Sequence, residues 1–267
     1  MIIKCSIKMK NKVLTLVLLG IAFCSIQAQD AEADFNSYFS YNVDYRLNKK
    51  TKLKFGQLIA FKYQPFDFQY SQMKFGIAHR VTKKTTVDFY YKPMYFKGNT
   101  LSRWYHRLST SISKSSKLFS LPLKNTITAE WHFPKLQKYQ YRFIYTLKYS
   151  FKNKILPLRA TPYIKYQLYY YLGGKPLDYF DETGEVLVAR QSPDDFHRYR
   201  IGGGIRFRPA KYFYVTLYYI WQEEFNTKLT TNRSINILNN SQTAIKYPFN
   251  DYQVVGLSLS YSITRKN

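Results

Sequence analysis

The sequence predicts an all-β fold, a single antiparallel meander β-barrel of about 12 strands, with a range of 10 to 12. The first observation is the stretch 139–151, YQYRFIYTLKYSF, in which every odd position is Tyr, Phe or Leu and the even positions are mostly polar. Successive side chains of a strand point to opposite faces, so this alternation indicates one apolar face and one polar face. The stretch also exceeds the roughly 9 to 11 residues with which a tilted strand crosses a bilayer.

Composition is the second observation. The chain has 27 Tyr and 20 Phe among 267 residues, yet its mean hydropathy is −0.40. Apolar and polar residues must therefore be interleaved, which is typical of a transmembrane barrel with lipid outside and polar groups inside. No run of 18 apolar residues occurs, so the sequence excludes a transmembrane helix.

Residues 1–28 are typical of a cleaved signal peptide. Lysines at positions 4, 8, 10 and 12 precede the apolar run 13–24, and Ala28 supplies a small residue for cleavage. A lipoprotein is the alternative, but Phe23 stands before Cys24 where a small residue is needed. We therefore expect residues 29–267 to form the barrel domain. Both cysteines, Cys5 and Cys24, lie in the removed segment, which excludes disulfides and thiol chemistry in the mature chain.

Eleven segments continue the alternation in chain order. They are 35–47, 53–63, 72–81, 87–92, 103–112, 121–133, 139–151, 159–171, 198–207, 213–221 and 252–263. Pro157 and Pro162 cannot donate ladder hydrogen bonds, so we expect irregular backbone at the start of the eighth segment. Bacterial single-chain barrels have an even number of strands, so we expect a twelfth strand within 223–247 or around 30–34.

The connections between these segments are of two kinds, which alternate along the chain. One kind is mostly short and basic, at 48–50, 82–84, 152–154 and 208–211, with 114–120 longer. The other kind includes two long segments, 172–197 and 222–251. Transmembrane barrels combine short periplasmic turns with longer extracellular loops, so this asymmetry predicts that the two kinds lie at opposite ends of the barrel.

Alternation alone does not distinguish a membrane barrel from a soluble periplasmic β-protein, which would bury the aromatic face. The number and length of the strands, the Tyr-rich apolar face and the signal peptide favour the cell outer membrane of a Gram-negative bacterium. In that location the expected partners are the lipid bilayer with its lipopolysaccharide and the barrel-assembly machinery.

Several segments resemble a known family. The runs DFNSYFSYNVDYRLNKKTKL at 34–53, RYRIGGGIRF at 198–207, LYYIWQEE at 217–224 and VVGLSLSYSI at 254–263 are similar to the Bacteroidota family catalogued as domain of unknown function 2490 (DUF2490). At the start of the last segment this chain has Asp251, Tyr252 and Gln253 where an Asn-His pair is expected. The resemblance implies an outer-membrane β-barrel without an assigned activity, and it brings no catalytic residues.

If the apolar face meets lipid, the polar face lines the lumen. That face carries many Lys and Arg but only three acids, Asp44, Asp88 and Glu130. A basic channel attracts anions, so the sequence predicts a narrow pore for small anionic solutes or a structural envelope protein. Alternatively, some of these cations lie at strand ends and bind lipid phosphates. The candidate anion path is Arg103, Arg107, Arg142, Lys148, Arg198, Arg200 and Arg206.

An outer-membrane lipid hydrolase is the alternative function. Glu130 and His132 share one face and resemble a base with its orienting acid, but none of the four His has a Ser two residues away on the same strand face. We therefore interpret the pair as a hydrogen bond in the lumen and expect no enzymatic activity.

Other patterns predict no site. The Gly202, Gly203 and Gly204 run lacks the Lys and the helix of a phosphate loop. The acids in 172–197 do not have the spacing of a calcium loop. No metal or cofactor is expected, and export disfavours a nucleic acid partner for the basic, aromatic chain.

Overall fold

The computed structural model describes residues 34–63, 66–98, 102–118, 121–151 and 157–264. Within these ranges, eleven long strands form a closed barrel. They are β1 (Asp34–Arg46), β2 (Thr51–Lys62), β3 (Asp67–Arg80), β4 (Thr85–Phe96), β5 (Arg103–Leu118), β6 (Leu121–Phe133), β7 (Tyr141–Ser150), β8 (Thr161–Leu172), β11 (Phe196–Ala210), β12 (Phe213–Glu224) and β15 (Tyr252–Thr264). The predicted all-β barrel in meander order is confirmed. The predicted signal peptide, residues 1–28, lies outside the described residues.

Two hairpins stand outside the barrel. They consist of β9 (Leu177–Phe180) with β10 (Leu187–Gln191), and of β13 (Ile237–Leu238) with β14 (Ile245–Lys246). Two short 3-10 turns, η1 (Pro157–Arg159) and η2 (Thr231–Arg233), complete the described secondary structure. The irregular backbone expected at the start of the eighth segment is confirmed at Pro157–Arg159, which forms η1, but Pro162 lies within β8 opposite Ile205.

The barrel closes with an odd number of strands. Ten neighbouring pairs are antiparallel, from β1 with β2 to β12 with β15, so β1 and β15 run in the same direction where they complete the ring. The expected twelfth strand is absent from the described part of 223–247, which forms β13 and β14 outside the ring. Residues 30–33 lie outside the described residues.

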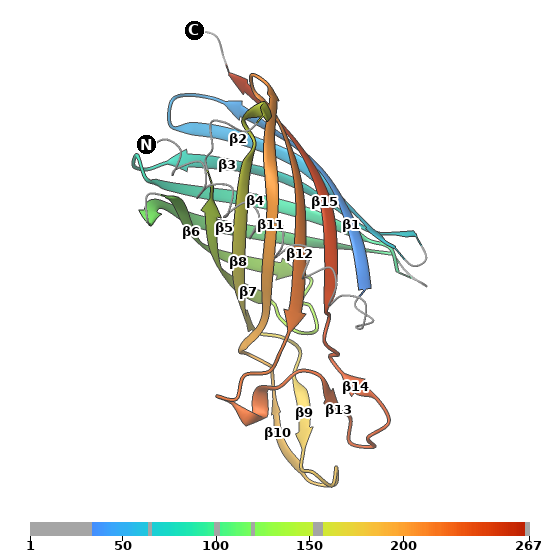
Figure 1. The fold of residues 1–267 in the computed structure, drawn as a ribbon. Helices are drawn as coiled ribbons and strands as arrows, with labels where there is room; N and C mark the ends of the chain where they lie inside the picture. The colour runs from blue at the N-terminus through green and yellow to red at the C-terminus, as the bar shows by residue number, and fades with distance from the viewer. Residues whose placement is uncertain (1–33, 64–65, 99–101, 119–120, 152–156, 265–267) are drawn as a thin grey trace, which may run out of the picture. The chain divides into compact units, whose positions relative to one another are not determined.

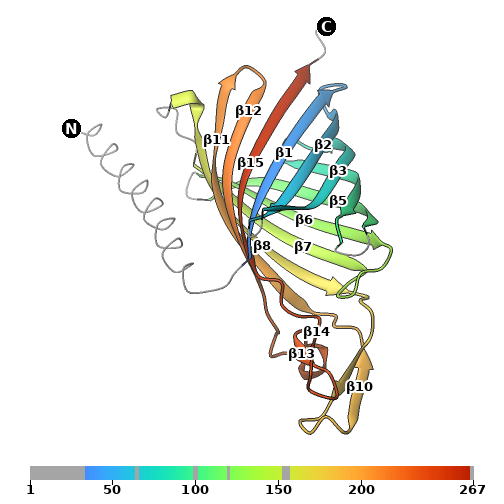
Figure 2. The same ribbon diagram turned by 90° about the vertical axis from the view of Figure 1, so that its right-hand side faces the viewer.

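The two kinds of connection lie at opposite ends of the barrel, as predicted. We call the end with the short connections the turn rim; it includes residues 47–50, 81–84 and 211–212. The loop rim carries residues 134–140, 173–195 and 225–251. Figures 1 and 2 show β9, β10, β13 and β14 gathered beyond the loop rim, whereas β15 ends at the turn rim. β1 therefore begins at the loop rim and β15 ends at the turn rim.

The apolar face of the strands points outward. Phe39, Ile127 and Leu217 are 52%, 62% and 51% exposed, and large apolar side chains are exposed on every barrel strand. The polar face points inward, where Asn36, Asp88 and Glu130 are buried. This arrangement contradicts a two-sheet sandwich, in which the aromatic side chains would be hidden between the sheets. Among the described residues, no helix is long and apolar enough to span a membrane.

The segments between the long strands at the loop rim pack against each other. The Tyr179 hydroxyl donates a hydrogen bond to the Ser234 carbonyl (3.1 Å), and the Tyr247 hydroxyl donates one to the Lys175 carbonyl (3.2 Å). Ile235 is completely buried between them. The two long segments therefore form an ordered extension of the barrel.

Inner glycines make room for tyrosine rings on the neighbouring strand. Tyr90 is the register partner of Gly76, and a Cβ atom on Gly76 would lie 2.2 Å from the Tyr90 ring and 2.4 Å from the Phe89 carbonyl oxygen. Tyr218 lies over Gly256 in the same way. Because glycine has no side chain, the aromatic ring of the neighbouring strand can lie over it and fill the barrel interior without a collision.

We expect Gly76→Ala to lower the free energy of unfolding by about 1 to 3 kcal/mol, because the added methyl group collides with both a ring and a backbone oxygen. Urea unfolding followed by tryptophan fluorescence measures this change. The matched control is Gly203→Ala, whose Cβ atom would meet only the Tyr163 carbonyl oxygen at 3.4 Å. Equal stability of the two variants would contradict the packing role of Gly76.

Candidate functional site

The predicted basic residues lie at three levels of the barrel. Arg107, Arg142, Arg198 and Arg200 are on the inner face in the half nearest the loop rim, together with Glu130 and His132. Lys148 and Arg206 lie in the half nearest the turn rim, and Arg103 is exposed at the loop rim. The predicted path is therefore not one continuous cluster.

Glu130 is the centre of the first buried cluster. Its Oε2 atom accepts hydrogen bonds from Arg142 Nε (2.9 Å) and Nη2 (2.5 Å). Its Oε1 atom accepts from Lys92 Nζ (3.3 Å) and Arg107 Nη1 (3.4 Å). These residues come from β4, β5, β6 and β7, and cross-strand register brings them together: Glu130 is the partner of Arg142. One buried carboxylate thus contacts three cations.

Glu224 is the centre of a second buried cluster, which the sequence analysis missed. Its Oε1 atom accepts hydrogen bonds from Arg198 Nε (3.0 Å) and the Tyr171 hydroxyl (2.8 Å). Its Oε2 atom accepts from the Asn250 backbone N–H (3.0 Å) and pairs with the ammonium of Lys138. Lys138 belongs to the β6–β7 connection, and burial lowers its pKa against the opposing effect of Glu224. Glu224 therefore joins the barrel wall to two loop-rim segments.

The ring of Tyr169 lies between the two clusters. The guanidinium carbons of Arg142, Arg198 and Arg200 are 5.3, 5.7 and 5.3 Å from its centroid. Arg200 has no carboxylate partner among the described residues; it donates hydrogen bonds to Gln222 Oε1 and to the Tyr252 hydroxyl, each at 2.6 Å. Cations over aromatic faces within about 6 Å are attracted to the ring quadrupole. The ring therefore lies among three like charges, of which Arg142 and Arg198 are paired with carboxylates and Arg200 is not.

Together these side chains fill much of the loop-rim half of the lumen. We call this group the plug: Met94, Glu130, His132, Arg142, Tyr169, Tyr171, Arg198, Gln222, Glu224 and Val254. Tyr169 is 1% exposed, and Tyr171, His132 and Val254 are 0% exposed. These inward side chains are almost completely inaccessible to solvent, whereas Lys92, Arg107 and Arg200 at the same level are partly exposed. The plug therefore fills much of the lumen on the loop-rim side.

On the loop-rim side of the plug there is a cavity of about 580 Å³. Its charged lining residues are all cations, namely Arg103, Lys135, Lys138, Lys175 and Arg198. Tyr105 and Tyr139 form part of its wall, and Tyr139 packs against Tyr171 of the plug at 4.5 Å between centroids. Such a lining favours an anion and disfavours a cation.

The Glu130–His132 pair gains a neighbour that the sequence did not indicate. Register places Ser109 opposite Glu130, and both Ser109 and His132 are almost completely buried. However, neither Ser109 Oγ nor either ring nitrogen of His132 has a hydrogen-bond partner, and Glu130 is held by three cations. A serine nucleophile needs a hydrogen-bonded base and access for substrate. This geometry supplies neither.

The remaining sequence candidates have structural roles. Gly202, Gly203 and Gly204 lie within β11 and pair with β8 and β12. The loop acid Asp181 caps its own turn, where the hydroxyl of Thr183 holds the pKa of this carboxyl below its usual value. In the described part of the chain, no three His, Cys, Asp or Glu side chains form a group that could hold a metal ion.

Comparisons with known proteins add no relative. No protein-family model matches the chain, and neither the curated proteins nor the solved structures contain a match. The resemblance to DUF2490 therefore stays a prediction.

We expect Glu130→Gln to lower the free energy of unfolding by about 3 to 5 kcal/mol, because three buried cations lose their shared anion. The matched control is Asp44→Asn, since Asp44 pairs with Lys52 at 3.6 Å with both side chains about one-third exposed. A surface pair of this kind contributes about 0 to 1 kcal/mol. Urea unfolding compares the two variants, and a smaller loss in Glu130→Gln than in Asp44→Asn would contradict the role of the cluster.

Proposed function

We propose that this protein is an integral outer-membrane β-barrel whose interior favours anions. The observation that carries the proposal is the apolar outer face, which is exposed on every barrel strand. In water this surface would be a large aggregation-prone patch, whereas in a bilayer it contacts acyl chains. The short turns then lie on the periplasmic side and the ordered loop-rim extension on the outer side, as in known transmembrane barrels. The resemblance to DUF2490 is consistent with this location.

The charge distribution supports an anion-related role. The cavity at the loop rim has only cationic charged residues, and the lumen beyond the plug carries further lysines and arginines. Because the plug fills much of the lumen, we propose a narrow path for small anionic solutes that conducts only when the plug rearranges. A structural envelope protein is the alternative if the plug never opens. The proposal contains no enzymatic step, because Ser109 and His132 are sealed from solvent and do not hydrogen-bond.

The membrane location predicts the effect of a charge on the outer face. Ile127 lies in the middle of β6 and is 62% exposed, so Ile127→Arg should lower barrel stability by about 2 to 4 kcal/mol in lipid vesicles. The matched control Ile127→Phe keeps the position apolar and should fold normally. Membrane fractionation with a gel that compares heated and unheated samples checks the location. Recovery of the wild-type chain from the periplasm, without a heat-dependent change in migration, would contradict the proposal.

Planar bilayers test the anion path. We expect small, anion-selective currents from the wild type and larger ones from Tyr169→Ala, because Tyr169 fills the plug. The matched control is Tyr166→Ala on the outward face of the same strand, which should leave the currents unchanged. The reversal potential in a KCl gradient measures selectivity. Cation-selective currents, or no current from either the wild type or Tyr169→Ala, would contradict the anion path. The structural envelope protein would then be the remaining alternative.

A further inference from the structure

Three lysines form a row across the inner wall of the barrel. Lys124 on β6 is the register partner of Lys148 on β7, and Lys148 is the register partner of Lys165 on β8. Neighbouring strands are about 4.8 Å apart, so the three side chains leave the wall within about 10 Å of one another. Like charges directly opposite each other destabilise a sheet. The row therefore lowers the stability of the barrel when no anion is bound.

No acid within the described residues forms an ion pair with this row. Among the described residues, none of the three lysines forms an ion pair within 4.0 Å. The wall on the other side of the barrel is different, because Lys52 pairs with Asp44 and Lys54 pairs with Asp88 at 3.1 Å. At the turn-rim end, one wall of the barrel therefore contains ion pairs, whereas the other carries three lysines on which Asp88 is the only acid seen to act, at Lys124 and beyond ion-pair distance.

Further cations adjoin the row. Lys148 is influenced by the charges of both Lys124 and Arg206, and Lys165 by that of Arg200. Aromatic rings hold two of these cations: Lys148 Nζ lies 3.7 Å from the Tyr163 centroid, and Arg206 lies 3.9 Å from that of Tyr214. Stacking restricts the side chains without neutralising them.

The row is accessible from the turn rim. Lys124 is exposed and Lys148 and Lys165 are half-buried, in contrast to the sealed plug. The next register position after Lys165 is Gly202, which has no side chain to cover the row. The inner wall on this side is thus basic and partly accessible to solvent.

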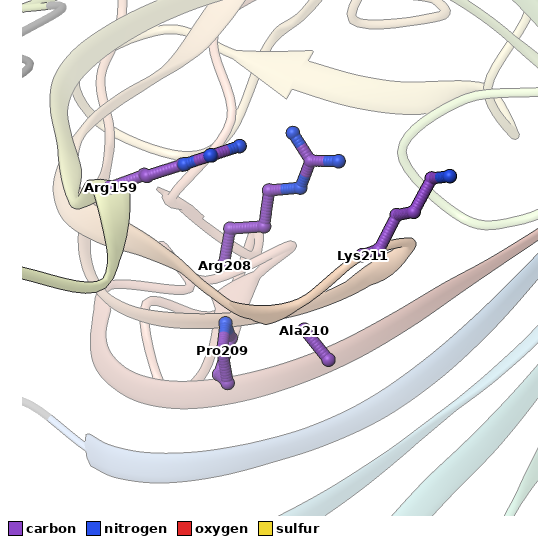
Figure 3. A pocket seen from close by; sticks show the side chains of 5 residues that line it. All are labelled: Arg159, Arg208, Pro209, Ala210 and Lys211. Carbon is purple, nitrogen blue, oxygen red and sulfur yellow. The ribbon is translucent and has the colours of Figure 1, made fainter.

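A basic pocket lies at the turn rim. It has a volume of about 420 Å³ and is lined by Arg159, Arg208, Pro209, Ala210 and Lys211. Figure 3 shows the side chains of Arg159, Arg208 and Lys211 rising on the same side of the β11–β12 turn. Arg208 also approaches the Tyr214 ring that holds Arg206, at 5.6 Å, so the rim pocket and the lumen share one aromatic residue.

We infer that the row of Lys124, Lys148 and Lys165 is a binding site for an anion with two or more phosphate groups, which enters past Arg159, Arg208 and Lys211 at the turn rim. Lysine ammonium groups bind phosphate as point charges with rotatable donors, and three in a line match successive phosphates better than one compact monoanion. This inference rests on the proposed function in one respect, because both require an interior that attracts anions. It places a specific phosphate-binding site on the turn side of the plug.

Titration calorimetry with inorganic tripolyphosphate tests the site on the full-length protein purified in a zwitterionic detergent. We expect saturable one-to-one binding that salt weakens, with inorganic phosphate binding far more weakly. Lys148→Met should reduce the affinity at least about tenfold, since it removes the central charge-assisted contacts. Lys54→Met is the matched control, because Lys54 already has Asp88 as its partner and should retain tripolyphosphate binding. The heat-dependent gel shift confirms that each variant is folded.

A second arm separates a free phosphate compound from a lipid headgroup. Phosphatidylglycerol in mixed micelles can reach the rim pocket but not the row inside the lumen, so Arg208→Met would weaken lipid binding whereas Lys148→Met would not. Unchanged tripolyphosphate affinity in Lys148→Met, an equal loss in Lys54→Met, or binding of the lipid alone would overturn the inference. Because calorimetry needs no current, tripolyphosphate binding by a protein that is silent in bilayers would support the site while contradicting the conducting path.

Discussion

The two-residue period of the strands, combined with closure of the sheet into a ring, is the constraint on which the rest of the structure depends. Closure leaves no strand edge, and the period sends every second side chain to the outer face. That face is apolar along all eleven described strands, so each charged group of the other face must find its partners inside the ring. The plug, the glycine–tyrosine pairs and the lysine row are different solutions to this one requirement.

In the plug, few acids serve as partners for the inward-facing cations. Glu130 and Glu224 each contact more than one cation, and the Tyr169 ring contacts Arg142, Arg198 and Arg200, of which only Arg200 has no carboxylate partner among the described residues. Burying an ion pair gains little net stability, whereas losing one partner costs several kcal/mol. Such a network is sensitive to rearrangement. This property is consistent with the proposal that the plug rearranges when an anion passes.

The lumen is divided by charge compensation. Towards the loop rim, cations are buried around carboxylates and rings. Towards the turn rim, Lys124, Lys148 and Lys165 lie opposite one another without forming an ion pair among the described residues. The loop-rim cavity is also lined by cations, so basic surfaces flank the plug on both sides. An anion would meet favourable potential before and after the plug, which is the arrangement expected of a selective path.

Local periodicity determined a large part of this protein: the strands, their outward and inward faces, the two kinds of connection and the basic interior are visible in the sequence, because side-chain direction alternates over neighbouring residues. Pro157 marked the irregular backbone before β8, whereas the close contacts of Gly76 and Gly256 with tyrosine rings were not predicted. Only the tertiary structure decided the parallel closure of β1 with β15, the Glu224–Lys138 pair across 86 residues and the stacking of three arginines on Tyr169. These depend on register between distant strands and on how loops fold back. A pattern of period two is unchanged when a strand slides by two residues, so it carries no information about which partners meet.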